Sequence, residues 1–368
     1  MAGRSPAPTR QARPAATPTP RSSRSWWSRH GEAWRDWAVL AVLNHALLLT
    51  AALTRPSWPV LMLIAVPLAC TLAITTLTVL HDAGHKQFAR REWPNVFAVQ
   101  SAAPFGLWVA HWALKHRVHH RLSQVYPVDE STRSSSFVRL HPAAPLRPCH
   151  RWQHFYTWGL YSLAWVGEIK SQATYLRTGV VTGNDDPWST RKRIGSFVAE
   201  KVLCLALLFP YGYLLGVGNL ALLLVTAMTV GSVFTALVLV VGHINVGLEP
   251  TDVAPSGREW AAHLVKTTAS FSISSRTVRW LTGGMTLHLA HHLRPAAPRR
   301  DLPALHEGKV AELVASTGLP MIVYPSFASG VAGHYRRLRD LGRPVAAVAP
   351  STGSAAGNAS TARSVPAA

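Results

Sequence analysis

The chain has 368 residues, of which 48% are hydrophobic and only 15% are charged, with a formal net charge of +20. The hydrophobic content excludes a wholly disordered chain, and the small charged fraction is not that of a typical basic nucleic-acid-binding protein. Three widely spaced cysteines provide neither a disulfide framework nor a paired-cysteine metal site. The excess of Arg over Lys and the many Ala and Pro residues are typical of a GC-rich bacterial genome.

The two ends of the chain differ in composition from its middle. Residues 1–25 are rich in Ala, Pro, Arg, Ser and Thr and contain no apolar run, so we expect a disordered basic tail rather than a secretory signal. Residues 343–368 have a similar composition and are expected to be disordered as well. A single membrane domain is therefore predicted for residues 26–342.

Four apolar stretches without acidic residues, Lys or Arg lie inside this domain: 37–54, 58–80, 202–217 and 220–241. Three of them are long enough to cross a hydrocarbon core of about 30 Å. The stretch 202–217 is shorter, and Glu200 and Lys201 are expected at its interfacial end. Short turns at 55–57 and 218–219 join the stretches in pairs, which favours two transmembrane hairpins over buried helices of a soluble protein.

The basic residues predict the sidedness of the spans. If both hairpins cross and return, their outer turns contain one basic residue, Arg55, and the other 36 of the 37 Lys and Arg lie on the opposite side. The positive-inside rule makes that side cytoplasmic, together with both termini. Because topology explains the charge, no nucleic-acid partner is predicted. The segments 93–114 and 155–167 suit helices that lie in the membrane interface. We thus expect an all-α integral membrane protein with four transmembrane helices in two hairpins and a cytoplasmic helical cap.

Nine of the 18 histidines form a pattern near the predicted helix mouths. They make an HxxxH box, two HxxHH boxes and one single residue after the fourth span: His81, His85, His116, His119, His120, His243, His288, His291 and His292. On a helix, residues at i, i+3 and i+4 share one face, so each box presents two or three imidazoles together. The predicted topology places all nine on the same side of the membrane.

Nine imidazoles exceed the four to six ligands that one ion commonly takes, so two ions are the simplest interpretation. The spacing does not name the metal, but a pair of redox metals fits better than zinc, because catalytic zinc generally has three protein ligands and structural zinc usually has Cys. Asp82, beside His81, is either an acceptor that orients a ligand ring or a solvated acid at a helix end. His111 is expected at the interface, and His45, next to Asn44, is expected to form hydrogen bonds within the bundle.

The boxes and their placement around two helix hairpins resemble the membrane fatty acid desaturase family over residues 37–342. The stretch 283–295, with its box HLAHH, is similar to the third box of acyl-lipid and front-end desaturases. The later segments 318–327 and 334–339 also resemble the end of that subgroup.

The resemblance implies a non-haem diiron centre, with O₂ as co-substrate and the nine histidines as ligands: His81 and His85 of box one, His116, His119 and His120 of box two, His288, His291 and His292 of box three, and His243. Two features depart from the family pattern. Leu239 stands where some members have an Asn that holds a metal-bound water, and whether Asn245 replaces it is open. The sequence HPAA at 141–144 lacks the glycines of a fused cytochrome b5 haem motif.

The expected function is an O₂-dependent fatty acyl desaturase of the bacterial inner membrane, with a cytoplasmic active site. Its acyl chain is linked to CoA, to a carrier protein or to a lipid. The tail is expected to thread between the spans and the interfacial segments, with the head group among basic residues. Electrons are expected from a separate ferredoxin or cytochrome with its reductase, because the chain has no flavin, nicotinamide or Fe–S motif. A hydroxylase, ketolase or acetylenase of the same superfamily is the first alternative, and a membrane metal-ion transporter is the second.

Overall fold

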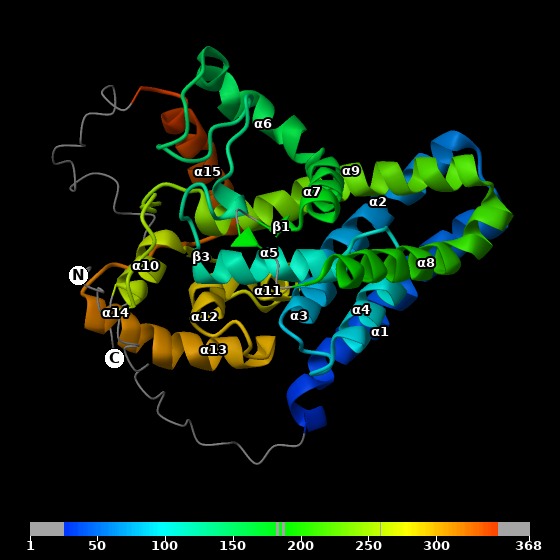
Figure 1. Ribbon diagram of the computed structural model, residues 1–368, viewed down its shortest axis with the longest axis horizontal. Helices are drawn as coiled ribbons and strands as arrows, with labels where there is room; N and C mark the ends of the chain where they lie inside the picture. Colours follow the sequence, from blue (N-terminus) through cyan, green and yellow to red (C-terminus); the bar gives the residue numbers. More distant parts are fainter. Residues whose placement is uncertain (1–25, 182–183, 186–187, 258, 345–368) are drawn as a thin grey trace, which may run out of the picture.

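The computed structural model describes residues 26–344, apart from 182–183, 186–187 and 258, and these residues are mostly helical. Four long helices extend to the right of Figure 1, and the shorter elements form a cap at one end of them. The long helices are α1 (Trp26–Thr54), α2 (Trp58–Thr75), α8 (Thr190–Leu215) and α9 (Val217–His243). The predicted tail 1–25 and the part of the predicted tail 343–368 from residue 345 onward lie outside the described residues.

Four helical segments of the described chain are long and apolar enough to cross a membrane: His30–Thr54, Trp58–Gly84, Thr190–Leu215 and Val217–His243. Many of their large apolar side chains face outward, with Leu63 70% and Phe209 72% exposed. Exposed apolar surface on this scale marks a contact with lipid or with another protein. The prediction of an all-α integral membrane protein is therefore confirmed.

The helix that contains the third predicted stretch, α8, begins at Thr190, well before residue 202, and passes through Glu200 and Lys201. The interfacial placement of these two residues stays a prediction. The helix continues through both residues because their side chains face the protein and find partners there. Glu200 is buried and its Oε2 accepts a hydrogen bond from the Val109 amide at 2.7 Å. The Lys201 ammonium donates to Gln172 Oε1 at 3.0 Å. These partners are remote in sequence, so the length of an apolar run does not reveal that the helix continues past the two charged residues.

The second and fourth spans pack closely against each other and both end at the cap. α2 continues through a π-helical turn (Thr76–Leu80) into α3 (His81–Gly84), and α9 ends at His243. Near the middle of the contact, a Cβ added at Gly231 would lie 2.8 Å from the Ala69 carbonyl oxygen. Such close backbone approach at a small residue is typical of helix packing in membranes.

The cap contains the remaining helices, two short strand pairs and several turns of 3₁₀ or π helix (Figure 1). Its helices are α4 (Glu92–Ala102), α5 (Val109–Arg121), α6 (Gln153–Tyr161), α7 (Ala164–Thr178), α10 (Trp260–Thr267), α11 (Arg276–Leu281), α12 (His288–Leu293), α13 (Leu302–Leu305), α14 (Ala311–Thr317) and α15 (Phe327–Leu341). β1 (Val180–Val181) pairs antiparallel with β2 (Asn184–Asp185), and β3 (Ser270–Phe271) pairs parallel with β4 (Val323–Tyr324). The 3₁₀ turns are Glu130–Thr132, Pro148–Trp152, Met285–Leu287 and Arg299–Asp301, and a second π turn is His306–Val310.

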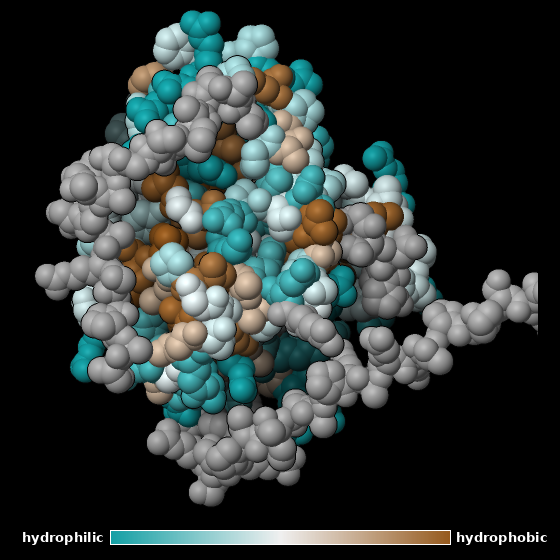
Figure 2. All heavy atoms as spheres, turned by 90° about the vertical axis from the view of Figure 1, so that its left-hand side faces the viewer, coloured by the Kyte–Doolittle hydropathy of each residue, from teal (hydrophilic) through white to brown (hydrophobic). Residues whose placement is uncertain are grey.

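The two segments predicted to lie in the membrane interface are divided between helices. The segment 93–114 covers most of α4, a break at residues 103–108 and the start of α5, while 155–167 covers parts of α6 and α7. Trp93 on α4 and Phe155 on α6 are 67% and 59% exposed. In contrast, α5 is an inner element of the cap and lies above α12 in Figure 1. On the left-hand face of the molecule, hydrophilic and hydrophobic residues are interspersed (Figure 2).

Replacing Gly231 with alanine is expected to lower the thermal stability of the purified protein in detergent. The new Cβ would meet backbone of α2, which cannot rotate away, and overpacking of this kind costs about 1–3 kcal/mol. Gly218→Ala is the control, since nothing lies within 4 Å of a Cβ at Gly218. Equal unfolding midpoints for the two variants would contradict the close approach of α2 and α9.

Candidate metal centre

The nine histidines of the boxes come together in two groups at the cap ends of α2 and α9. The first group contains His81, His85, His116, His120 and His291, and the second contains His119, His243, His288 and His292. Within each group the candidate ligand atoms all lie within 4.8 Å of one another. None of the other nine histidines belongs to either group.

The nitrogen atoms of the first group form a continuous chain of short contacts. The Nε2 atom of His116 lies 2.9 Å from that of His85 and 3.0 Å from that of His120. The Nε2 atom of His291 lies 3.0 Å from those of both His120 and His81. In the second group, the Nε2 atoms of His243 and His292 are 3.1 Å apart.

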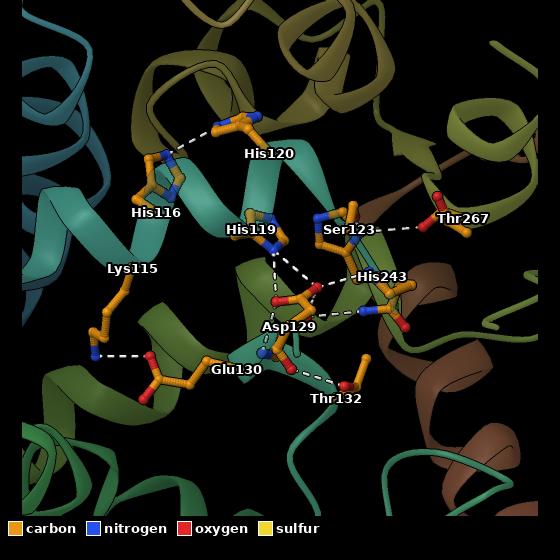
Figure 3. Close-up of polar contacts among 12 residues, drawn as sticks. Lys115, His116, His119, His120, Ser123, Asp129, Glu130, Thr132, His243 and Thr267 are labelled. Atoms are coloured by element: carbon orange, nitrogen blue, oxygen red, sulfur yellow. Dashed lines mark hydrogen bonds and ion pairs between the residues drawn. The ribbon is translucent and has the colours of Figure 1, made fainter. Parts of the chain in front are cut away.

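Helical spacing divides boxes two and three between the two groups. On α5, His116 and His120 are four residues apart and join the first group, while His119 points to the second. The His119 ring centre lies 5.8 Å from that of His116, and its Nδ1 atom is directed to Asp129 (Figure 3). On α12 the pattern is reversed, because His291 joins the first group and its two neighbours in the box join the second. Two helices thus serve both groups, and the His120 and His292 ring centres are only 4.4 Å apart.

The ends of the spans have local features that bring the remaining histidines into place. The π turn Thr76–Leu80 immediately precedes His81, and such turns widen a helix and are frequent at functional sites. Near the end of α9, a Cβ at Gly242 would lie 1.9 Å from His288 Nδ1. Only glycine at this position allows box three to approach His243, whose ring centre is 4.4 Å from that of His288.

These donor sets fit metal ions better than they fit hydrogen bonds among themselves. A neutral imidazole nitrogen either donates or accepts one hydrogen bond, so five nitrogens can form at most two of the four contacts of the first group. A cation can accept lone pairs from all five. Two nitrogens bound at right angles to one ion, each about 2.1 Å from it, are about 3.0 Å apart, which agrees with the contacts above.

The protonation state of the ligand candidates also suits metal binding. Burial, followed by neighbouring histidines, lowers the pKa of His116, His120, His288, His291 and His292 well below its usual value. Burial and His119 lower the pKa of His85 to about 4. These rings are neutral near pH 7, as metal coordination requires.

Asp129 is a further candidate site residue, which the sequence did not indicate. Its carboxylate is fully buried and accepts a hydrogen bond from His119 Nδ1, at 3.0 and 3.1 Å from its two oxygens (Figure 3). The Gln124 amide and the Ser131 amide and hydroxyl donate to the same carboxylate. Burial alone would raise the pKa of Asp129, but His119 and these donors lower it to about 2. The carboxylate therefore stays ionised, fixes the His119 tautomer and directs its Nε2 atom to the second group.

Asp82 contacts an arginine instead of an imidazole, while the Nδ1 atom of its neighbour His81 has no hydrogen-bond partner among the described residues. The carboxylate is 4% exposed, so it is not a solvated acid either. Arg299 donates to Asp82 at 3.0 Å and to Asp36 of α1 at 2.8 Å. This buried triad joins α1, box one and the segment that follows box three.

A second, partly buried ionic cluster holds the other side of α5. The Lys115 ammonium contacts Glu168 of α7 at 2.5 Å and Glu130 at 2.8 Å. Burial raises the pKa of Glu168, but Lys115 and His111 lower it to about 2. His111 is 1% exposed and lies 3.4 Å from Glu168, so its predicted interfacial position was wrong. The prediction that His45 forms hydrogen bonds within the bundle is confirmed, because its ring contacts the Tyr211 hydroxyl at 2.6 Å.

Asn245 uses its side-chain amide for contacts with the backbone. Its Nδ2 donates to the carbonyls of Val241 and Gly330, and its Oδ1 accepts from the Val246 amide at 2.9 Å. His334 lies nearby, between the Ile244 carbonyl and the Tyr161 hydroxyl. These contacts attach α15 to the end of α9 and so support His243.

Replacing Asp129 with asparagine is expected to weaken metal binding by about 10–100-fold, as losses of such ligand-orienting partners commonly do. An amide cannot supply the negative charge and would leave His119 free to adopt the other tautomer. The measurement is metal content after dialysis against a graded series of chelator concentrations. The exposed Asp252→Asn variant is the control and is expected to retain metal like the unmodified protein. Equal retention by both variants would contradict this role of Asp129.

Comparison with known proteins agrees with this arrangement. Residues 56–325 match the family model described as fatty acid desaturase. The chain is 27% identical to an sn-1 linoleoyl-lipid 6-desaturase of Synechocystis over 78% of its own length and 82% of that protein. It is 24% identical to an sn-1 linoleoyl-lipid 6-desaturase of Arthrospira platensis over 71% and 72% of the two chains. An acyl-lipid (8-3)-desaturase of Physcomitrium patens is 23% identical over 72% of this chain and 57% of its own. Because the family model covers most of the chain, including all three boxes, the protein belongs to the fatty acid desaturase family and is an oxidoreductase that acts on fatty acyl chains.

Proposed function

We propose that the nine histidines bind two iron ions and that the enzyme uses O₂ and two electrons to introduce a double bond into the acyl chain of a membrane lipid. The observation that carries this proposal is the convergence of the histidines into two neighbouring groups. Bound iron would supply the oxidant that removes hydrogen from unactivated C–H bonds. The names of the cyanobacterial relatives support a lipid-linked substrate over a CoA or carrier-protein thioester.

The role of the chain itself is to hold the ligands rigidly and to limit water. His81, His291 and His292 are at most 5% exposed, so few water molecules can reach their nitrogens. Asp129 orients His119, and the Thr267 carbonyl accepts from His243 Nδ1 at 3.1 Å, which directs Nε2 of each ring inward. Orientation of this kind is the main means by which a protein selects one C–H bond of a long chain.

We place the histidine centre on the cytoplasmic side of the bacterial inner membrane. The turn that contains Arg55, between α1 and α2, and the break at Gly216, between α8 and α9, lie at the end of the spans away from the cap (Figure 1). Nearly all other basic residues of the sequence lie toward the cap or in the tails. The positive-inside rule therefore supports this orientation.

Product analysis tests the reaction. The purified, iron-loaded protein is supplied with glycerolipid, O₂ and reductant, and its products are analysed by mass spectrometry. We expect the loss of two hydrogens from one acyl chain and no product under anaerobic conditions. An added oxygen would instead identify a hydroxylase, and O₂-independent metal uptake into vesicles without any lipid product would identify a transporter.

Replacing His119 with alanine is expected to remove iron and activity while the protein remains in the membrane. His306→Ala is the control, because His306 lies in the second π turn, outside both groups. Iron content by elemental analysis and turnover by product formation are measured for both variants. The ligand assignment fails if the two variants lose iron equally.

No turnover is expected with NADH or NADPH alone, and turnover is expected once a ferredoxin or cytochrome and its reductase are added. The sequence that most resembles a dinucleotide-binding turn, residues 216–221, is the junction of α8 and α9 and follows a helix instead of a strand. We therefore propose a separate electron donor. Sustained turnover with a nicotinamide alone would contradict it.

A further inference from the structure

A groove of about 410 Å³ lies between α4, α5 and α8, outside the histidine centre. Its volume is within the range of about 300–1,000 Å³ that is common for small-molecule sites. The walls are mostly apolar: Val96 and Phe97 come from α4, Val109 and Ala113 from α5, and Leu203 from α8. The groove is therefore suited to an apolar ligand.

Trp112 separates this groove from the metal ligands. Its ring stacks on that of His116 with 4.5 Å between ring centres. On its other side it fills the space in front of Gly84, where an added Cβ would lie 2.5 Å from the indole. None of the nine box histidines lines the groove, although Ala83 and Gly84 of box one do. Trp112 thus stands between the Gly84 wall of the groove and the His116 ring.

Three cations surround the groove, namely Lys86, Arg117 and Lys192. All three are exposed, and none forms an ion pair with a carboxylate among the described residues. The Lys192 ammonium lies 3.9 Å from the centre of the Trp188 ring, which holds it at the groove. The site therefore has a surplus of positive charge at its edge.

Two acidic residues also line the groove and do not cancel this charge. Glu92 is a single exposed carboxylate opposite three cations. Glu200 is buried and bound to the first amides of α5, with its Oε2 2.7 Å from the Val109 nitrogen. Its oxygens are occupied by these amides, because Ala110 also donates to Oε1 at 3.3 Å. The groove edge remains attractive to an anion.

The groove residues of α8 form one stripe along a membrane span. Lys192, Ser196, Ala199 and Leu203 follow each other at helical spacing. At 1.5 Å per residue the stripe is about 16 Å long, from a basic first turn to the apolar interior of the span. The exposed Trp93 and Phe97 of α4 flank the same groove. An amphiphile with an anionic head and an apolar tail matches this gradient of polarity.

We propose that this groove binds an anionic phosphoglycerolipid, with its head group on Lys86, Arg117 and Lys192 and one acyl chain along α8. The site is distinct from the histidine centre. Its occupant would connect α4, α5 and α8, the helices that also meet at Glu200. The proposal rests on the placement of α8 as a membrane span and not on the identity of the desaturated substrate.

Native mass spectrometry of the full-length protein in detergent, titrated with phosphatidylglycerol or phosphatidylcholine, tests the head-group site. We expect preferential retention of phosphatidylglycerol and a decrease of about tenfold or more in the triple variant K86Q/R117Q/K192Q, since each basic residue near an anionic lipid adds to the attraction. The matched control R133Q/R276Q/R336Q removes three exposed cations that do not line the groove and is expected to retain the lipid. Equal retention by both triple variants overturns the proposal.

A second variant tests the tail site independently of charge. Ala199→Trp fills the apolar part of the groove and is expected to lower retention of both lipids, whereas Leu205→Trp, at an exposed position of α8 outside the groove, is expected to leave it unchanged. Unchanged retention in Ala199→Trp overturns the proposal, as does displacement of the lipid by inorganic phosphate at equal concentration. Desaturation of added lipid is measured in parallel, so that loss of the reaction is recorded separately from loss of this site.

Discussion

The convergence of nine imidazoles in one region is the constraint on which the rest of the fold depends. Lone pairs about 3 Å apart repel each other unless a cation or a proton lies between them, and protons can satisfy only some of the observed contacts. The desaturase must therefore hold its ligands in place through contacts at some distance from the nitrogens. The cap and the span ends provide those contacts.

Each supporting contact involves a part of the chain that is remote in sequence. Arg299 joins Asp36 and Asp82 across 263 and 217 residues, and it thereby fixes the end of the second span relative to box three. Gly242 lets box three approach the end of α9, because any side chain there would meet His288. Metal sites often require such outer partners, whose loss weakens binding although no ligand is removed.

The grouping of the nine histidines could be predicted from the sequence because the boxes obey helical spacing at the ends of apolar runs, and both signals are local. Asp129 could not be predicted, since it lies ten residues after its partner His119, in a loop without periodicity. The start of α8 at Thr190 could not be predicted for a related reason. An apolar run ends at a charged residue, whereas a helix continues if that charge faces a partner, and Glu200 finds its partner at the first turn of α5. Asp82 was identified as a candidate, but its partner Arg299 lies far away in the chain.

Glu200 shows how the membrane bundle and the metal centre depend on each other. A buried carboxylate within a span is unfavourable unless its charge is compensated, and the amides of Val109 and Ala110 supply that compensation. Without Glu200 these amides would be unsatisfied donors at the start of α5, because Trp108 provides no side-chain cap. The interaction therefore gives hydrogen-bond partners both to the carboxylate of α8 and to the first amides of α5. It fixes the beginning of the helix that carries His116, His119 and His120 to a residue inside the third span, so a displacement of that span would move three ligands together.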